Sequence, residues 1–320
     1  MLNPADFITR TALENYSIKY INEQTDFIAE EVFVPVVVSK TLTKKYQYSM
    51  EHMREVESRA TSKSVANKVD YGVFTSNLTT ELHKLAGDVD PHDMADADPA
   101  VADMEFDQAE NIMSRLLIKR ERLMNTLVAT SGNYPSDLTS SLGATATWAV
   151  AGGDPEADAK TVHKAIHARC GKMANSLALS LEGYLTLRTS PALRDRGKYT
   201  NGSAISDGDL KSLLMVENIH VCKARYNNAI QGAADSMAAI WDDHALFYVK
   251  GKPQRRAVSY GNMWMRNQIY SYSYEDQARG SGDGRIKTVE LGMEYVLTAG
   301  GVVSSSDADF ACGYFLDNIF

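Results

Sequence analysis

The chain has 320 residues, a formal net charge of -8 and 44% hydrophobic residues. This length allows two domains or one domain with long excursions, and the composition is typical of a folded protein rather than a disordered one. The amino terminus lacks the basic start and apolar run of a signal peptide, and the longest apolar stretch is too short to span a bilayer. The acidic charge argues against a surface that binds nucleic acid over its whole extent.

The three cysteines, Cys170, Cys222 and Cys312, are odd in number, far apart in the sequence and without C-x-x-C spacing. This pattern gives little support to a disulfide framework or a zinc site. We expect three small buried side chains in a chain made in a reducing cytoplasm.

The first 80 residues predict strands but no compact unit. An apolar run at residues 32–38 contains Pro35, which suits an edge strand or an extended arm on a neighbouring subunit. Residues 43–50 and 69–80 are predicted strands, and the charged segment between them has few large apolar residues. A hairpin of this length with so little apolar surface is not stable by itself in water. It must therefore lie on its own domain or on another chain.

A long helix is predicted at residues 99–129, after an acidic link at 88–98. Asp98 is a suitable N-cap and Pro99 suits the first helical position. At 1.5 Å per residue the helix would be roughly 46 Å long, enough to cross a subunit. An apolar stripe should pack on a sheet that includes the strand near 289–297, and a polar face should stay in solvent. The stripe is Ile112, Met113, Leu116, Met124 and Leu127, and the polar face holds Asp107, Glu110, Lys119 and Arg122.

Residues 155–255 predict an α/β subdomain, and two strands and a final run complete the chain. Asp154 and Pro155 begin a helix that ends near Gly171. Next come, in order, a strand at 177–181, a helix at 182–188, a turn at 191–195, a Gly/Ser/Asn-rich loop at 197–208, a helix at 209–215, and strands at 219–224, 245–250, 257–274 and 286–297.

Two groups of potential metal ligands have alternative interpretations. His163 and His167 lie at i and i+4 of a helix, but no Glu stands between them, so two solvated histidines are favoured. Five aspartates in the acidic link lack the glycine and terminal glutamate of a calcium loop. A solvated linker is favoured over a divalent ion that bridges subunits. The aspartates are Asp88, Asp90, Asp93, Asp96 and Asp98.

Two neighbouring segments carry recognisable motifs, Asn175-Ser-Leu-Ala-Leu-Ser and Ser190-Pro-Ala-Leu-Arg-Asp-Arg-Gly-Lys-Tyr199. They resemble the Asn-x-Leu-x-Leu strand and the Pro-x-Leu-x-Asp-Arg-x-Lys-Tyr turn of the major capsid proteins of tailed bacteriophages, and further similar segments follow the same order. Val216-Glu-Asn-Ile-His-Val-Cys-Lys-Ala and Ile240-Trp-Asp-Asp-His-Ala-Leu-Phe-Tyr-Val249 continue the match. Upstream, Tyr46-Gln-Tyr, Arg59-Ala-Thr and Val69-Asp-Tyr-Gly resemble its extended loop.

The resemblance implies an α+β protein with the Hong Kong 97-type capsid fold. Its parts would be an N-terminal arm (1–42), an extended loop (43–80), a peripheral domain (81–155) with spine helix 99–129, an axial domain (156–255) and return strands to the peripheral domain (256–320). The implied function is a structural virion protein, made in a bacterial host's cytoplasm, without catalysis or cofactor. It would self-assemble as hexamers and pentamers of an icosahedral shell around double-stranded DNA, with portal, scaffolding and decoration proteins as further partners.

The resemblance also implies two contact sites. Subunit contacts are expected in the extended loop, where mixed charge favours a protein interface over DNA; the residues are Tyr46, Tyr48, Arg54, Glu57, Arg59 and Lys63. A loop at the capsomer centre would include Asn201, Gly202, Ser203 and Asp207. The alternatives are an encapsulin-like nanocompartment shell and, from another class, a metal-dependent hydrolase that uses the aspartates with His163 and His167.

Overall fold

The computed structural model of the chain describes residues 8–9, 26–48, 55–62, 64–69, 73–90, 103–197, 205–230, 232–252, 258–266, 269–276, 286–299 and 311–320. Within these residues, two larger sheets pack around two main hydrophobic cores, one of which contains residues of both sheets. No described helix is both long and apolar enough to cross a membrane.

The first sheet is built around one long strand, β14 (Ile286–Ala299). Along one edge, β14 pairs with β13 (Tyr270–Asp276) and then with β12 (Gly261–Met265), and along the other with β5 (Glu81–Val89). The outer strands are β1 (Ile8–Thr9) on β13 and β2 (Phe33–Val37) on β12. The predicted strands near the carboxyl terminus therefore come together with a segment from the first forty residues.

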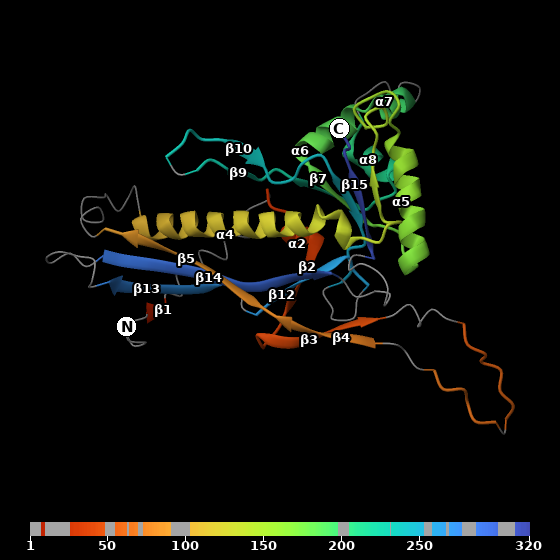
Figure 1. The fold of residues 1–320 in the computed structure, drawn as a ribbon, viewed down its shortest axis with the longest axis horizontal. Helices are drawn as coiled ribbons and strands as arrows, with labels where there is room; N and C mark the ends of the chain where they lie inside the picture. Colours follow the sequence, from red (N-terminus) through yellow and green to blue (C-terminus); the bar gives the residue numbers. More distant parts are fainter. Residues whose placement is uncertain are drawn as a thin grey trace.

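Helix α4 (Met104–Val128) covers one face of this sheet (Figure 1) and packs on β5 and β14. Ile112, Met113, Leu116 and Met124 are at most 3% exposed, and Leu127 is partly buried, so the predicted apolar stripe is confirmed. Asp107, Lys119 and Arg122 are exposed, and Glu110 is half-buried. The helix lies so close to β5 that a Cβ on Gly87 would stand 1.7 Å from Nε2 of Gln108.

The beginning of α4 differs from the prediction. Asp103 is the N-cap, with extended backbone angles, so the helix begins at Met104 rather than at residue 99. The predicted cap, Asp98, and Pro99 lie outside the described residues. The predicted acidic link is also shorter, because β5 continues to Val89 and Asp88 accepts a 2.8 Å hydrogen bond from the hydroxyl of Thr288.

The segment before the hairpin belongs to the core of this subunit. Strand β2 is an edge strand that contains Pro35, as predicted. However, the short helix α2 (Ala29–Val32) and β2 are buried against α4 and the first sheet, and Val32 and Phe33 are at most 1% exposed. Most of residues 28–34 are therefore buried within their own subunit, in agreement with the edge-strand alternative.

The predicted hairpin is present and projects from the body of the molecule (Figure 1, orange). Strands β3 (Leu42–Tyr48) and β4 (Val73–Thr79) pair antiparallel, with Leu42 opposite Thr79. At the base, Leu78 packs with Val36, Val38 and Trp264 on the face of the first sheet opposite α4. The second predicted strand, 69–80, is in fact followed at once by β5, which turns back onto β14.

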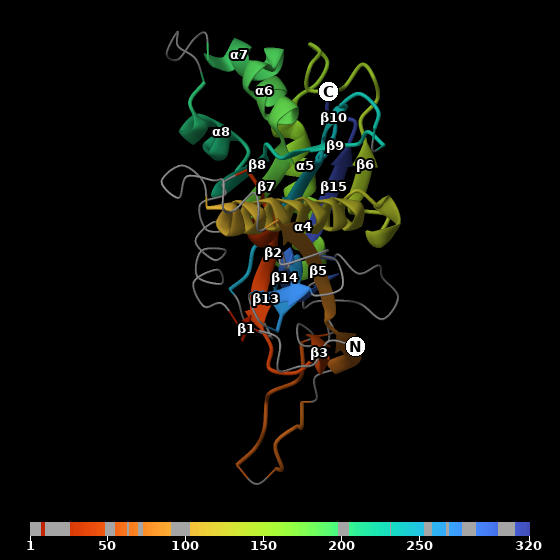
Figure 2. The same ribbon diagram turned by 90° about the vertical axis from the view of Figure 1, so that its left-hand side faces the viewer.

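The second sheet carries helices and lies at the other end of the molecule (Figure 2). Its strand order is β6 (Thr139–Ser141), β15 (Gly313–Asp317), β11 (Ala245–Tyr248), β7 (Ser176–Ser180) and β8 (Asn218–Cys222). Its helices are α5 (Pro155–Cys170), α6 (Leu181–Thr189), α7 (Pro191–Gly197) and α8 (Asp207–Leu213). Asp154 caps α5 as predicted, since its carboxylate accepts from the main chain of Glu156 at 3.1 Å.

Two strand pairings were not predicted. Strand β15 pairs with β11 and β6, so the segment 256–320, expected to return as a whole to the first sheet, is divided between the two sheets. A small hairpin of β9 (Arg225–Asn227) and β10 (Met237–Ala239) was missed as well, because each strand has only three residues.

Candidate functional site

The loop between β3 and β4 is held by hydrogen bonds within itself. Every described residue from 55 to 69 is exposed, including Val65 at 87%. Glu57 organises the loop: its carboxylate accepts from Arg59 N at 2.8 Å, and its carbonyl accepts from Asn67 Nδ2 at 2.8 Å. An extended segment with exposed valines gains little stability from its own subunit.

The predicted contact residues are spread along this hairpin. Tyr46 and Tyr48 lie in β3, opposite Thr75 and Val73 of β4. Glu57 and Arg59 lie further out, in the exposed loop. Arg54 and Lys63 lie outside the described residues. The hairpin therefore has a base of paired strands and an exposed outer loop. The sequence pattern did not predict where one ends and the other begins.

A hollow of about 250 Å³ lies on the face of the first sheet that α4 does not cover. The strand register places Lys84 of β5, Gly292 of β14 and Tyr270 of β13 side by side across this face. Part of the depth comes from Gly292, because a Cβ there would stand 3.0 Å from the Cβ of Lys84. The lining residues are Leu82, Lys84, Arg266, Tyr270, Tyr272, Glu290, Gly292 and Glu294.

Paired charges and tyrosine hydroxyls lie along the wall of the hollow. Lys84 Nζ lies 2.8 Å from Glu290 Oε1, and this hydrogen bond raises the pKa of Lys84. Tyr270 donates to Glu294 Oε2 at 2.8 Å, and Arg266 lies 3.3 Å from the same oxygen. Burial opposes the ionisation of Glu294, but these partners and Thr80 outweigh it, so the pKa of Glu294 lies below its usual value.

No motif in the sequence predicted a site on this face of the sheet. The available signal was the alternation of tyrosines at residues 270, 272 and 274, which a strand directs to one face. On the other side of the hollow, Lys84 of β5 contacts Glu290 of β14, 206 residues later in the sequence. That pairing could not be derived from the pattern.

At the far end of the second sheet, α6, α7 and α8 lie together (Figure 2). Asp207 is exposed at the start of α8 and accepts a 2.5 Å hydrogen bond from the hydroxyl of Tyr184, which ties α8 to α6. Ser206 and Asp209 form a reciprocal capping box at this helix start. The other predicted residues of the capsomer-centre loop, Asn201, Gly202 and Ser203, lie outside the described residues.

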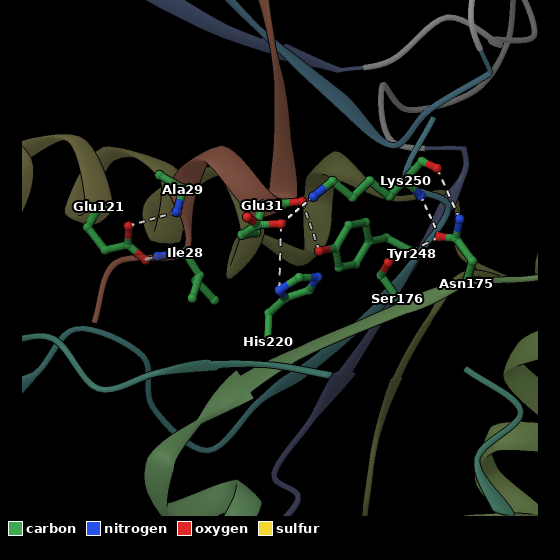
Figure 3. Close-up of polar contacts among 9 residues, drawn as sticks. All are labelled: Ile28, Ala29, Glu31, Glu121, Asn175, Ser176, His220, Tyr248 and Lys250. Carbon is green, nitrogen blue, oxygen red and sulfur yellow. Dashed lines mark hydrogen bonds and ion pairs between the residues drawn. The ribbon is translucent and has the colours of Figure 1, made fainter. Parts of the chain in front are cut away.

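A buried carboxylate joins α4 to α2 (Figure 3). The two oxygens of Glu121 accept from Ile28 N at 3.2 Å and Ala29 N at 3.0 Å, and Glu121 is fully buried. These N–H groups belong to the N-terminal end of a helix, which attracts a carboxylate. Burial raises the pKa of Glu121, and the two main-chain hydrogen bonds oppose that shift.

The same segment reaches the second sheet through Glu31 (Figure 3). Lys250 pairs with its carboxylate, His220 Nδ1 lies 3.8 Å from it, and the hydroxyl of Tyr248 donates to its carbonyl at 3.0 Å. Asn175 holds the main chain of Lys250 by accepting from its N–H at 2.7 Å and donating to its carbonyl at 3.0 Å. Residues 28–31, α4 and the second sheet are therefore fastened to one another at one junction.

The sequence missed this junction. Glu121 follows Leu117 by four residues and precedes Met124 by three, so it stands on the apolar face of α4. A charged residue on that face was the only signal. Nearby, Arg120 is 3% exposed and pairs with Glu30 at 2.6 Å.

The possible metal ligands do not come together in the part of the chain that the structure describes. His163 is buried, and its Nε2 lies 2.8 Å from the carbonyl of Leu214, so the prediction that it is solvated is wrong. His167, one turn on, is exposed as expected. No three His, Cys, Asp or Glu side chains among the described residues could hold an ion together. Asp93, Asp96 and Asp98 lie outside those residues.

Comparisons with known proteins agree on one kind of protein. No family model matches the chain. It is 25% identical over 262 residues to the major capsid protein of Burkholderia phage BcepMu, covering 79% of this chain and 82% of that protein. It is also 25% identical over 309 residues to the major capsid protein of Pseudomonas phage JBD67, covering 93% and 96%.

Solved structures share the fold over nearly the whole chain. A phage-related protein from Bordetella bronchiseptica RB50 matches with a TM-score of 0.73 and 20% identity over 98% of both chains. The capsid of cyanophage P-SCSP1u gives 0.54 at 11% identity, covering 92% of this chain and 88% of that one. A virus-like particle from Pyrococcus furiosus gives 0.55 at 11% identity, covering 95% and 98%. The fold alone does not separate phage capsids from the Pyrococcus particle.

The sequence relatives separate them, because both are phage major capsid proteins matched over most of their length. Their similarity agrees with the collinear motifs in the sequence and with the two-sheet architecture. The function is thus structural rather than enzymatic, and it is performed in the virion shell. The chain is thus similar over most of its length to the major capsid proteins of bacteriophages, and it has the Hong Kong 97-type capsid fold.

Proposed function

We propose that the chain assembles as hexamers and pentamers into a closed icosahedral shell that encloses double-stranded DNA. The observation that carries this proposal is the loop at 55–69, whose described residues are all exposed. A shell closes because the same patches meet at each repeat, so a projecting element needs a matching recess on every copy.

The open face of the first sheet is the recess that fits this loop best. The loop presents Glu57, Arg59 and the exposed Val65. The hollow offers both signs of charge, tyrosine rings and Leu82, which is 54% exposed. Mixed charge on both partners sets their register and selects the correct partner, whereas burial of the valines would supply affinity. The loop of one subunit would therefore lie on the first sheet of the next.

The ends of the molecule would have different roles in the shell. The α6–α8 end, with Asp207 exposed, would lie near the capsomer axis, where one sequence must serve rings of five and six. The exposed face of α4 carries Asp107, Lys119 and Arg122 and would face the lumen. Packaged DNA would then meet charges of both signs with little net attraction, so that it can slide and later leave. Portal, scaffolding and decoration proteins would act on the assembled shell.

Deletion of residues 51–63 tests the role of the loop. The truncated chain should keep its circular dichroism spectrum and its melting temperature but form no shells by electron microscopy. Loss of folding would mean that the hairpin belongs to the subunit core, and shells of normal size would refute the loop contact. Nuclease-protected double-stranded DNA is expected inside particles from infected cells; protein cargo without DNA would instead favour a cellular nanocompartment.

A photo-crosslinking residue at Val65 tests where the loop lies. In assembled shells it should link to a peptide of another subunit that contains Tyr270 and Tyr272. The matched control is the same probe at Met237, which is 56% exposed on β10 and should not link to that peptide. Links from Val65 only to other parts of the chain would place the loop on a different surface.

A further inference from the structure

The hairpin joins the body of the subunit at two threonines. The chain enters the hairpin at Thr41, immediately before β3, and leaves it at Thr80, between β4 and β5. The main chains of these threonines meet, because Thr80 N donates to the carbonyl of Thr41 at 3.0 Å. From Thr80 the chain continues directly into the first sheet as β5. A change of backbone direction at this pair would therefore swing the whole hairpin.

Two charged side chains of the first sheet hold both threonines. The hydroxyl of Thr80 donates to Oε1 of Glu294, and Arg266 donates to the hydroxyl of Thr41 at 2.7 Å. Arg266 also pairs with the Glu294 carboxylate at 3.3 Å, and its main-chain N–H donates to the carbonyl of Glu294 at 3.1 Å. Thr80 and Glu294 are each 5% exposed. The four residues come from separate segments and form a closed ring of polar contacts.

We propose that Glu294 is a positioning residue that sets the direction in which the hairpin leaves the subunit. Apart from the ring, the described contacts at the base include the apolar packing of Leu78 with Val36, Val38 and Trp264. Apolar burial is non-directional, so it holds the hairpin near the sheet but fixes its angle weakly. Hydrogen bonds to a buried carboxylate are strong and depend on geometry, so they can select one angle.

The carboxylate is mounted on a rigid part of the molecule. Glu294 belongs to β14, which is paired along both of its edges with β12, β13 and β5. Main chain in the middle of a sheet opens locally far less often than loops and chain ends do. The ring therefore refers the direction of the hairpin to the centre of the first sheet.

The same carboxylate faces the hollow. Glu294, Arg266 and Tyr270 all line it, and Tyr270 donates to Oε2 of Glu294 at 2.8 Å. The surface proposed to receive a neighbouring loop thus contains the group that directs the subunit's own loop. If loops dock as proposed, each outgoing hairpin is fixed relative to the receiving surface of its own subunit, so the same geometry can repeat from copy to copy. The hairpin's direction is a property of one subunit, whereas this consequence for assembly rests on the proposed function.

Distances within one subunit test the proposal. Spin labels are attached through a genetically encoded keto amino acid at Thr75, exposed on β4, and at Met237, exposed on β10, which leaves the native cysteines untouched. The labelled full-length protein is diluted before assembly into an excess of unlabelled protein, so that double electron–electron resonance reports distances within single subunits. The wild-type protein should give one narrow distance distribution.

Variants of Thr80 break and restore the ring. Thr80→Val removes the hydroxyl that reaches Glu294 and should broaden or shift the distance distribution. A hydrogen bond to a charged group favours one arrangement by a factor of roughly ten or more, so its loss should populate other directions measurably. Thr80→Ser keeps the hydroxyl and should restore the narrow distribution.

Tyr270→Phe is the matched control. It also removes one hydroxyl donor from Glu294, but this donor comes from β13 rather than from the hairpin, so the wild-type distribution should persist. Thr41→Val removes the acceptor of Arg266 at a half-buried position, should act like Thr80→Val, and decides the matter if Thr80→Val fails to fold.

Two results would overturn the proposal. One is an unchanged distribution in Thr80→Val, or in Thr41→Val where Thr80→Val does not fold. The other is an equal change in Tyr270→Phe, which would mean that any loss at the carboxylate acts through general loosening. A changed distribution in a threonine variant that still forms normal shells would support the positioning role and count against the proposed docking of the loop.

Discussion

The junction around Glu121 and the loop at 55–69 use charged residues in opposite ways. At the junction, the carboxylate of Glu121 is fully buried and both of its oxygens accept main-chain hydrogen bonds. In the loop, Glu57 is exposed and bonds only to neighbours within ten residues. The first arrangement is complete within one subunit. The second fixes the shape of a segment that has no core of its own, which suits a surface completed by another copy.

The difference has an energetic consequence. Changes at or near the junction should lower the free energy of unfolding of a single subunit, because they leave cavities or unpaired buried groups. Changes in the loop should affect assembly and leave that free energy nearly constant. The following predictions test the first half of this contrast, in order of decreasing effect.

Leu116→Ala should have the largest effect. Leu116 is 3% exposed between α4 and the first sheet, and its truncation should cost about 2 to 5 kcal/mol of subunit stability. The matched control is Lys119→Ala on the exposed face, which should change stability by no more than about 0.5 kcal/mol. Urea unfolding of the two variants measures both free energies of unfolding. A loss of stability for Lys119→Ala equal to or larger than that for Leu116→Ala would mean that the helix is oriented the other way.

Acid should weaken the subunit through His244. Burial lowers the pKa of this imidazole to about 4, while it contacts Asn125 of α4 at 3.0 Å and stacks on Trp241. The unfolded chain binds this proton more tightly than the folded chain does. The stabilisation that comes from neutral His244 is therefore fully present above pH 6.5 and is lost as the pH falls towards 4. Its size is about 3 kcal/mol at about 1.4 kcal/mol per pKa unit.

Urea unfolding of wild type and His244→Gln at pH 7 and pH 5 measures this contribution. The difference in stability between the two pH values should be smaller in His244→Gln. An unchanged difference would mean that other groups cause the loss in acid.

Glu121→Gln should have the smallest of the three effects. Glutamine keeps the shape, but only one of its two terminal groups can accept, so one main-chain N–H of Ile28 or Ala29 loses its partner. The expected loss is about 1 to 3 kcal/mol. Thermal melts should show this loss, whereas Glu57→Gln in the loop should melt like wild type. If the two variants melt alike, the junction is no more stabilising than the loop.

The sequence predicted local features well and long-range ones poorly. The apolar stripe of α4 and the cap of α5 follow from helical periodicity and from Asp154 with Pro155, which are signals within one element. The start of α4 was placed too early because Asp98 and Asp103 both precede plausible helical runs. The hydrogen bonds of Glu121 to Ile28 and Ala29 and the pairing of β15 with β11 join distant segments, which no local pattern specifies.

The proline in strand β2 also bears on aggregation. Strand β2 is an outer strand of the first sheet, and its last residue, Val37, is 70% exposed. An edge of this kind invites the strands of other molecules to add to it, which is a hazard for a protein that must reach high concentration to build shells. Pro35 has no N–H with which to continue such a ladder. Subunits can therefore crowd together without fusing their sheets, which leaves association to the surfaces that close a shell.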